Sequence, residues 1–280
     1  MGASSPEIST KEAIAAFLAA GRYRRLAPAT LDAYRWALNR LESHCLLLPT
    51  RSNALLPVLG DRKLALESTR DLRRVLISFF KWAAREYKVP NPTVDLERLP
   101  RRRQLPVVLE PDQVRKLMEV AGDGRDRAML ALVLDTGIRL GELVGLQRSD
   151  VGVTMRVTGK SGTRQVPISD QVRELVLALV EAGPMWIGLK GQLTRDGVRQ
   201  VFERLFRRAG ITGRKCRGPH ILRHTFGTFY CRAGGNVRIL QEIMGHRNIT
   251  TTMIYVHLAG RDVAKDHALY SPIQTMGLVA

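Results

Sequence analysis

Cysteine is scarce in this 280-residue sequence. The three present, Cys45, Cys216 and Cys231, are too few and too scattered for a disulfide framework or a zinc knuckle, and they favour a reducing compartment. Long apolar runs are also missing, because no stretch reaches the roughly 18 residues of a membrane span. The N-terminus lacks the basic segment and long apolar core of a signal peptide. These absences predict a soluble cytoplasmic protein without a membrane partner.

Acidic residues are few relative to basic ones. The chain has 44 Lys and Arg against 26 Asp and Glu, which gives a net charge of +18 and a pI near 10.7. Residues 1–100 carry 16 basic and 10 acidic side chains, and residues 101–280 carry 28 and 16, so the excess is not confined to a tail. Such a field attracts polyanions, and nucleic acid is the first candidate. The alternative is a protein that is basic without such a partner.

Three stretches of the first hundred residues predict helices. Residues 9–21 begin with a capping residue, Ser9 or Thr10, and end at Gly21. Residues 27–45 place apolar side chains three or four positions apart, which gives one buried face. Residues 67–89 form a third long helical stretch. Together they predict a small helical domain over residues 1–98.

A basic linker is predicted over residues 99–106. The surrounding sequence holds prolines at positions 92, 100 and 106 and little apolar periodicity, as is typical of interdomain segments. The consecutive arginines Arg101, Arg102 and Arg103 could lie along a phosphate backbone. The alternative is a run of charge that is simply solvated.

Residues 107–280 predict a second domain, mainly α with a small antiparallel β-sheet. The sheet is indicated by two short alternating stretches, residues 152–159 and 163–169, joined by Lys-Ser-Gly. The apolar stretch over residues 125–137 predicts a buried helix. Further helices are predicted over residues 109–121, 169–183, 194–210, 218–234, 236–245 and 249–259.

Five polar residues of this second domain are weak signals when each is taken alone. Arg139 could pair with an acidic neighbour on its own helix. Lys160 in a hairpin turn is ordinarily solvated. His220 and Arg223 share a helix face, where a lone histidine is more often a core residue. Tyr255, in a helical stretch, is more often buried than reactive.

Together these residues suit phosphoryl transfer through a covalent tyrosine. A phosphodiester under attack concentrates negative charge, which the guanidinium forks of two arginines can neutralise. Tyrosine is a poor nucleophile at its ordinary pKa near 10, so it needs a base or a cationic field. The leaving oxygen needs a proton, which a lysine in a hairpin turn can supply. A phosphotyrosyl ester conserves the bond energy, so no ATP and no other cofactor is expected.

A metal-dependent nuclease is the weaker reading. Such an enzyme needs clustered carboxylates, and the acidic residues near these motifs show no recognisable ligand spacing: Asp135, Glu142, Asp150 and Glu242. His220 and His224 stand four residues apart and could bind zinc. Neither a His-Glu-x-x-His pattern nor a cysteine pair accompanies them, so no metal is expected.

The order and spacing of these residues resemble the catalytic domain of the tyrosine recombinases, the phage-integrase and Xer family. From about Pro106 to about Asp266, the segments that carry the resemblance are "TGIRLGEL", "GKSGTRQVPI" and "HILRHTFGTFYCRAGGNVRILQEIMGHRNITTTMIYVH". The first half resembles the family's helical core-binding domain, with "ATLDAYRWALNRLESH" as its marker. The resemblance implies two domains that form a clamp around double-stranded DNA.

The resemblance implies a site-specific DNA recombinase or integrase that cleaves and rejoins DNA through a 3′-phosphotyrosyl intermediate, without metal or ATP. Tyr255 would be the nucleophile. Arg139 and Arg223 would clamp the non-bridging phosphate oxygens, His220 would accept or shuttle the tyrosine proton, and Lys160 would protonate the leaving 5′-oxygen.

Two supporting residues and an assembly are also implied. His246 would hydrogen-bond the phosphate, and Glu142 would orient its neighbours. Four protomers would assemble on two DNA sites, from monomers or dimers in the free state, and the enzyme would work at the nucleoid. The apolar C-terminal segment "ALYSPIQTMGLVA" could dock on a neighbouring protomer or could be a frayed tail. Only about eight residues precede the first predicted helix, which favours a simple Xer-type recombinase or a compact mobile-element integrase.

Two alternatives stay open within the same chemistry. One is a DNA-binding relative without catalysis, and the other is an enzyme like the type IB topoisomerases, which usually present a lysine where His220 stands. The target DNA sequence cannot be read from these residues, because phosphate contacts carry no sequence information. The residues predicted to contact DNA are Arg35, Arg40, Arg101, Arg102, Arg103, Arg195 and Arg199.

Overall fold

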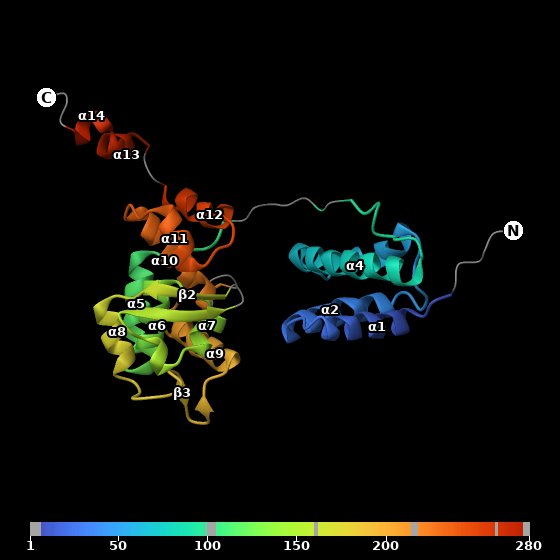
Figure 1. Cartoon of the computed structure of the whole chain (residues 1–280), viewed down its shortest axis with the longest axis horizontal. Coiled ribbons are helices and arrows are strands. Elements are labelled where there is room, and N and C mark those ends of the chain that lie inside the picture. The colour runs from blue at the N-terminus through green and yellow to red at the C-terminus, as the bar shows by residue number, and fades with distance from the viewer. Residues whose placement is uncertain are drawn as a thin grey trace. The chain divides into compact units, whose positions relative to one another are not determined.

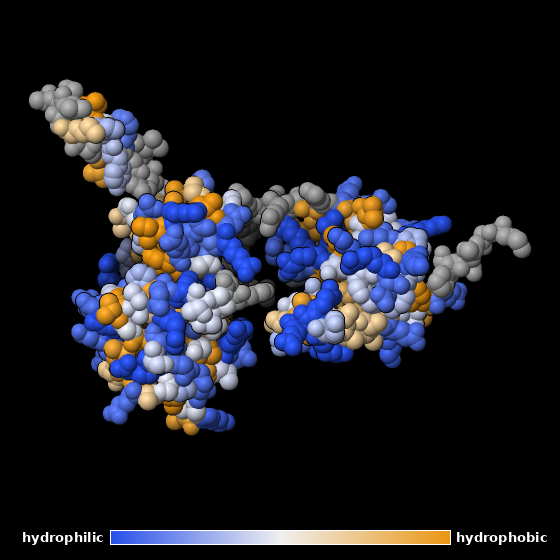
Figure 2. All heavy atoms as spheres, in the orientation of Figure 1, coloured by the Kyte–Doolittle hydropathy of each residue, from blue (hydrophilic) through white to orange (hydrophobic). Residues whose placement is uncertain are grey.

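The computed structural model describes residues 7–97, 99, 105–159, 162–213, 218–260 and 263–276. The chain divides into two compact units, Met1–Arg102 and Arg103–Ala280, and each has its own hydrophobic core. Helices dominate both units, and the described strands belong to the second (Figure 1). Hydrophilic residues cover much of the visible face of each unit (Figure 2). Among the described helices, none is long and apolar enough to cross a membrane.

The three long helices predicted for the first unit are confirmed. Ser9 caps the first of them, since its hydroxyl accepts a hydrogen bond from the backbone N–H of Glu12. Phe17 of this helix packs on Phe79 with ring centroids 5.4 Å apart, which joins the first and last long helices in one core. The described elements are α1 (Thr10–Tyr23), α2 (Pro28–Glu42), a 3-10 turn (Ser52–Leu55), α3 (Leu56–Leu59) and α4 (Leu66–Tyr87).

The sequence predicts that the first helix ends at Gly21, but in the structure this helix continues to Tyr23. Gly21 is buried, and a Cβ atom placed on it would come within 2.9 Å of the Leu31 side chain of α2. The glycine therefore allows two helices to approach closely and does not end α1. The 3-10 turn and α3 were not predicted, because both are too short to show a helical period.

The second unit is mainly helical, as predicted. Helix α10 packs against both α6 and α12. The predicted buried helix is α6, whose residues from Ala128 to Val133 are all buried. The described elements are α5 (Pro111–Ala121), α6 (Arg125–Thr136), α7 (Leu140–Gly145), a 3-10 turn (Arg148–Asp150), β1 (Thr154–Gly159), β2 (Gly162–Pro167), α8 (Asp170–Leu177), β3 (Ile187–Gly188), β4 (Gly191–Gln192), α9 (Arg195–Arg208), α10 (Pro219–Arg232), α11 (Val237–Met244), α12 (Ile249–Ala259), α13 (Val263–Tyr270) and α14 (Pro272–Thr275).

The predicted hairpin is confirmed. Strands β1 and β2 pair antiparallel, from Thr154 opposite Pro167 to Gly159 opposite Gly162. The second unit differs from the prediction at several elements, because α7, the 3-10 turn at Arg148–Asp150, α13 and α14 were not predicted. Helix α8 ends at Leu177 and does not reach residue 183, and a second small hairpin, β3–β4, follows it. Strands of two residues show no alternation of apolar and polar side chains, so the sequence carries no signal for them.

Candidate active site

The predicted catalytic residues that the structure describes meet in the second unit. Arg139 is the N-terminal cap of α7. His220 and Arg223 lie on α10, and Tyr255 lies on α12. His246 stands in the turn between α11 and α12 and stacks on the Tyr255 ring, with ring centroids 6.2 Å apart. The fold thus brings residues from distant parts of the sequence to the neighbourhood of one helix, α10.

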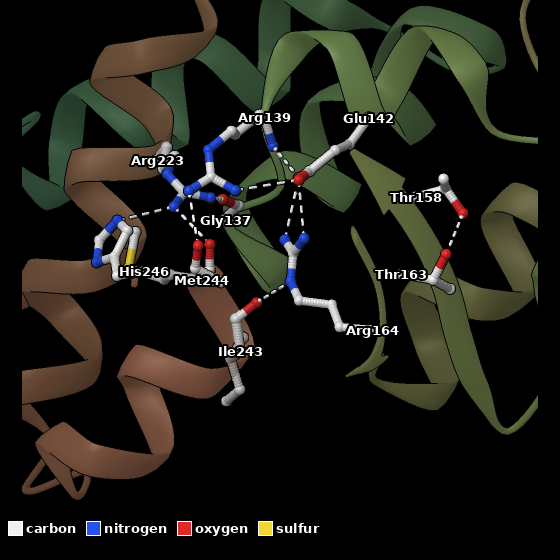
Figure 3. A network of polar contacts seen from close by, with 11 residues as sticks. Gly137, Arg139, Glu142, Thr158, Thr163, Arg164, Arg223, Ile243, Met244 and His246 are labelled. Atoms are coloured by element: carbon white, nitrogen blue, oxygen red, sulfur yellow. Dashed lines mark hydrogen bonds and ion pairs between the residues drawn. The ribbon is translucent and has the colours of Figure 1, made fainter. Parts of the chain in front are cut away.

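Arg223 is buried in this cluster. Its guanidinium donates hydrogen bonds to the backbone carbonyls of Gly137 and Met244, the latter at 2.7 Å, and Nη2 lies 2.9 Å from Nε2 of His246 (Figure 3). Burial, followed by the positive charge of Arg139, lowers the pKa of Arg223 to about 10. Arg223 therefore stays charged at neutral pH, and its position is fixed before any ligand binds.

Arg139 is held by Glu142, whose side chain is only 2% exposed. The backbone N–H of Arg139 donates to Glu142 Oε2 at 2.8 Å, and its Nη1 donates to Oε1 at 3.1 Å. Its Nη2 donates to the carbonyl of Gly245 at 2.9 Å. The same carboxylate accepts two further hydrogen bonds from Arg164 of β2. Burial alone would raise the pKa of Glu142, but its bonds to Arg164 and Arg139 lower it to about 2, so Glu142 is ionised at neutral pH.

Tyr255 is 2% exposed, and its hydroxyl lies 3.1 Å from Nδ1 of His224. Its ring lies against Gly227 of α10, where an added methyl group would come within 2.9 Å of three ring atoms. Burial raises the pKa of Tyr255, and the charges of Arg223 and Arg139 oppose that shift. Tyr255 is therefore both a packed aromatic side chain and a hydroxyl in a cationic surrounding, beside a possible base.

Two histidines of the cluster are neutral at pH 7. Burial, followed by neighbouring positive charges, lowers the pKa of both His224 and His246 to about 4, so both are neutral at pH 7. Nδ1 of His246 lies 2.9 Å from the Thr252 hydroxyl, which orients the ring. His220 is exposed at the start of α10, and desolvation followed by the charge of Arg223 lowers its pKa as well.

Residues 107–261 match the model of the phage integrase family. Over 231 residues the chain is 32% identical to the tyrosine recombinase XerD of Staphylococcus epidermidis, which covers 74% of this chain and 78% of that protein. The chain belongs to the phage integrase family. It is a site-specific tyrosine recombinase, an enzyme that cleaves and rejoins DNA. The tyrosine recombinase XerC of Rhodospirillum centenum is 34% identical over 214 residues, which span 69% of this chain and 61% of that protein.

Solved structures show that the recombinase shares its fold with integrases. The Tn1549 transposon integrase in complex with transposon right end DNA superposes with a TM-score of 0.76 at 21% identity, over 96% of this chain and 100% of that chain. A lambda integrase dimer bound to a core site gives the same TM-score at 19% identity, over 92% and 80% of the two chains. The expected fold, mainly helical with small antiparallel sheets, is thereby confirmed for the described residues.

Two residues of the recombinase cluster, His224 and Arg164, were not among the predicted catalytic residues. The available signal for His224 was its position four residues after His220 on one helix, and that spacing also fits a metal pair. The available signal for Arg164 was its place on the strand that follows the Lys160 turn. Its partner Glu142 lies 22 positions away, so spacing along one helix could not have indicated the pair.

Several predicted residues of the recombinase lie outside the cluster or outside the described residues. Lys160, Arg101, Arg102 and Arg103 fall outside the described residues. Arg35 and Arg199 are more than half exposed and pair with acidic residues on their own helices. Arg40 is less exposed, at 28%, and pairs with Asp61, and the Arg195 guanidinium lies over Gly141 at the start of α7.

Three of the four acidic residues considered for a metal site have separate partners. Asp135 accepts a hydrogen bond from the backbone N–H of Ser169 at 2.9 Å, and Asp150 pairs with Arg156 at 2.8 Å. Glu142 binds the two arginines described above. Within the part of the chain that the structure describes, no three His, Cys, Asp or Glu side chains lie close enough together to hold a metal ion.

The neutral histidines make the recombinase sensitive to acid. His224 and His246 have a pKa of about 4 in the folded protein and an ordinary pKa of 6.5, so the unfolded chain binds more protons between these values. We expect the free energy of unfolding to fall as the pH drops below about 6.5, by up to roughly 1.4 kcal/mol per pH unit for each histidine. Glu142 lowers the free energy of unfolding further only below its ordinary pKa of 4.5, and this loss continues as the pH falls toward its folded pKa of about 2.

Urea unfolding of the full chain followed by circular dichroism between pH 7.5 and pH 5 measures this slope. A His224→Asn variant is the matched comparison, because it removes one titrating ring and keeps a polar group beside Tyr255. We expect a shallower slope for the variant. Equal slopes for the two proteins would show that His224 does not titrate on unfolding in this range.

Proposed function

We propose that the recombinase cuts one DNA strand with Tyr255, holds that strand as a 3′-phosphotyrosyl ester and rejoins it to a partner strand. The observation that carries the proposal is one cluster of functional groups. The Tyr255 ring lies on His246, and Arg223 contacts the same histidine while the charge of Arg139 acts on both. A nucleophile and fixed cationic donors therefore stand around one point, as covalent phosphoryl transfer requires.

Arg139 and Arg223 would stabilise the charge that develops on the phosphate. Both guanidinium groups are held by backbone carbonyls and by Glu142 or His246, so they need little reorganisation when the transition state forms. Guanidinium forks match non-bridging phosphate oxygens in a bidentate manner. His246 would add a hydrogen bond to the same phosphate.

The Tyr255 proton would leave through the histidines of α10. Nδ1 of His224 lies 3.1 Å from the hydroxyl and is neutral at pH 7, so it can take the proton as the Tyr255 oxygen bonds to phosphorus. His220, one turn earlier and exposed, would then act as the shuttle to solvent. The P–O5′ bond breaks in the same step, and Lys160 would protonate the leaving oxygen. In the reverse reaction a 5′-hydroxyl from the partner strand attacks the phosphotyrosine.

A synaptic assembly would arise from contacts between copies of the chain. We propose four protomers on two DNA sites, with monomers or dimers in the free state. Helices α13 and α14, with the residue that follows α14, expose apolar side chains that suit docking on a neighbouring protomer (Figure 2). These side chains, 48% to 68% exposed, are Leu269, Tyr270, Ile273 and Met276.

The two compact units would clamp the DNA duplex between them. Residues 1–98 would be the core-binding domain, residues 99–106 a basic linker and residues 107–280 the catalytic domain. The arginines proposed to contact the phosphate backbone are Arg35 and Arg40 of α2, Arg195 and Arg199 of α9, and Arg101, Arg102 and Arg103 of the linker. The enzyme would act at the nucleoid.

A covalent adduct tests the proposed function. We expect incubation with a duplex nicked near the cleavage point to trap a protein–DNA product that survives SDS, with the DNA attached to the Tyr255 peptide. EDTA should leave the yield unchanged, and binding should weaken steeply with added salt because phosphate contacts dominate. Attachment at another residue, or loss of the adduct in EDTA, would contradict the proposal.

A further inference from the structure

Arg164 is an arginine of β2 whose three guanidinium nitrogens each donate a hydrogen bond inside the protein. Its Nη1 and Nη2 donate to Glu142 Oε1 and Oε2 at 2.7 and 3.0 Å, which is a bidentate fork (Figure 3). Its Nε donates to the carbonyl of Ile243 at 2.9 Å. The side chain is only 15% exposed. With these contacts Arg164 has little capacity left for DNA, so its contribution to the reaction must come through its neighbours.

The bond between Arg164 and Glu142 differs from the surface ion pairs of the same domain. In the pair of Arg156 and Asp150 the arginine is 56% exposed and the carboxylate 16%, so this pair is more open to water than the one with Glu142. The Glu142 side chain is 2% exposed, and a buried carboxylate requires a cation to compensate its charge. Arg164 therefore supplies charge compensation that a solvated pair would not need.

This arginine also joins three segments around the site. Through Glu142 it reaches the start of α7, where the backbone and Nη1 of Arg139 bond the same carboxylate. Through Ile243 it holds the C-terminal end of α11. The Gly245 Cα lies so near that an added Cβ would be 3.0 Å from the Arg164 guanidinium. The strand, the helix start and the turn that precedes His246 therefore share one contact point.

Charge sharing at Glu142 has a consequence for Arg139. Two guanidinium groups meet one carboxylate, and Arg164 occupies both oxygens while the Arg139 side chain bonds only one. Without Arg164, Glu142 could take the Arg139 fork in bidentate fashion and neutralise its charge. We propose that Arg164 is a positioning residue that compensates Glu142 and so leaves the Arg139 guanidinium available for the scissile phosphate. This inference rests on the role of Arg139 in the proposed function.

The test compares cleavage rates on two suicide duplexes that differ only at the scissile position. One carries the ordinary phosphodiester, and the other a methylphosphonate, which lacks the negative charge that Arg139 would stabilise. We expect Arg164→Ala to slow phosphodiester cleavage on the order of 10- to 100-fold, somewhat less than removal of a direct donor. The loss on the methylphosphonate should be several-fold smaller. The matched control, Arg156→Ala in the same hairpin, should leave both rates unchanged.

A second variant distinguishes charge compensation from general damage. Replacing the carboxylate in Arg164→Ala/Glu142→Gln removes the uncompensated charge, so phosphodiester cleavage should recover relative to Arg164→Ala alone. Urea unfolding at neutral pH shows whether each variant folds. If Arg164→Ala or the double variant does not fold, Arg164→Lys replaces it, because lysine keeps the charge and loses the bidentate fork. We expect Arg164→Lys to lose less activity than Arg164→Ala.

Equal losses on both duplexes, without recovery in the double variant, would overturn the role of Arg164 and leave the proposed function intact. The proposed function fails in a different way. It fails if the wild-type protein forms no adduct, or if Arg139→Ala cleaves the phosphodiester as fast as wild type, and either result also removes the basis of the inference.

Discussion

A Tyr255→Phe variant should form no covalent adduct with DNA and should still bind the duplex with nearly wild-type affinity. The change removes one oxygen, which is the atom proposed to bond to phosphorus, so no residual rate from this residue is expected. DNA affinity comes mainly from basic side chains and phosphate contacts, which the change leaves in place. The measurement is SDS gel analysis of the suicide duplex beside a mobility-shift titration of the same protein.

The fold should survive this change. The Tyr255 ring keeps its contacts with His246 and Gly227, and only the hydrogen bond to His224 is lost. We expect the free energy of unfolding to fall by about 0.5–1.5 kcal/mol, the usual net value of one hydrogen bond. Tyr230→Phe on the facing helix is the matched control and should form the adduct normally. An adduct formed by Tyr255→Phe would show that another residue is the nucleophile.

The local sequence of α12 gives little reason to interpret Tyr255 as a nucleophile. The residue is 2% exposed and packs in a small apolar cluster, as the simpler interpretation of a core aromatic predicts. The structure fits both interpretations of the Tyr255 environment, because the ring lies in a core cluster and the hydroxyl lies beside His224. The chemical role proposed for Tyr255 depends on Arg223 and Arg139 lying near the same side chain, and that proximity requires the fold.

The helices and the main hairpin could be predicted because each is encoded by periodicity within a continuous stretch. Polar partnerships could not, since they depend on which elements pack together. Glu142 was expected to orient its neighbours, but its bond to Arg164 joins α7 to a strand 22 positions later. His220 was expected to accept or shuttle the tyrosine proton, and the contact between His224 and the tyrosine was not predicted. His220 and His224 lie one helical turn apart, so the sequence does not show which of them lies nearer Tyr255. Only the packing of α12 against α10 places His224 beside the Tyr255 hydroxyl.

Arg223→Ala should lower both the cleavage rate and the stability of the recombinase. Loss of one preorganised donor to a developing negative charge commonly costs about 10²–10³-fold in rate, and we expect at least that here. The carbonyls of Gly137 and Met244 would lose their donor, at a cost of about 1–3 kcal/mol each if water cannot replace it. Single-turnover cleavage and urea unfolding measure the two effects separately.

Arg223→Lys separates charge from geometry. Lysine keeps the positive charge but cannot present two parallel donors, so it cannot hold two carbonyls and His246 in the arrangement of the native fork. We expect it to recover part of the stability and little of the rate. Arg232→Ala, at the exposed end of the same helix, is the control and should change neither. Cleavage by Arg223→Lys as fast as wild type would contradict this expectation. The phosphate would then need only a positive charge at this position, and the hydrogen bonds of the Arg223 fork would serve folding alone.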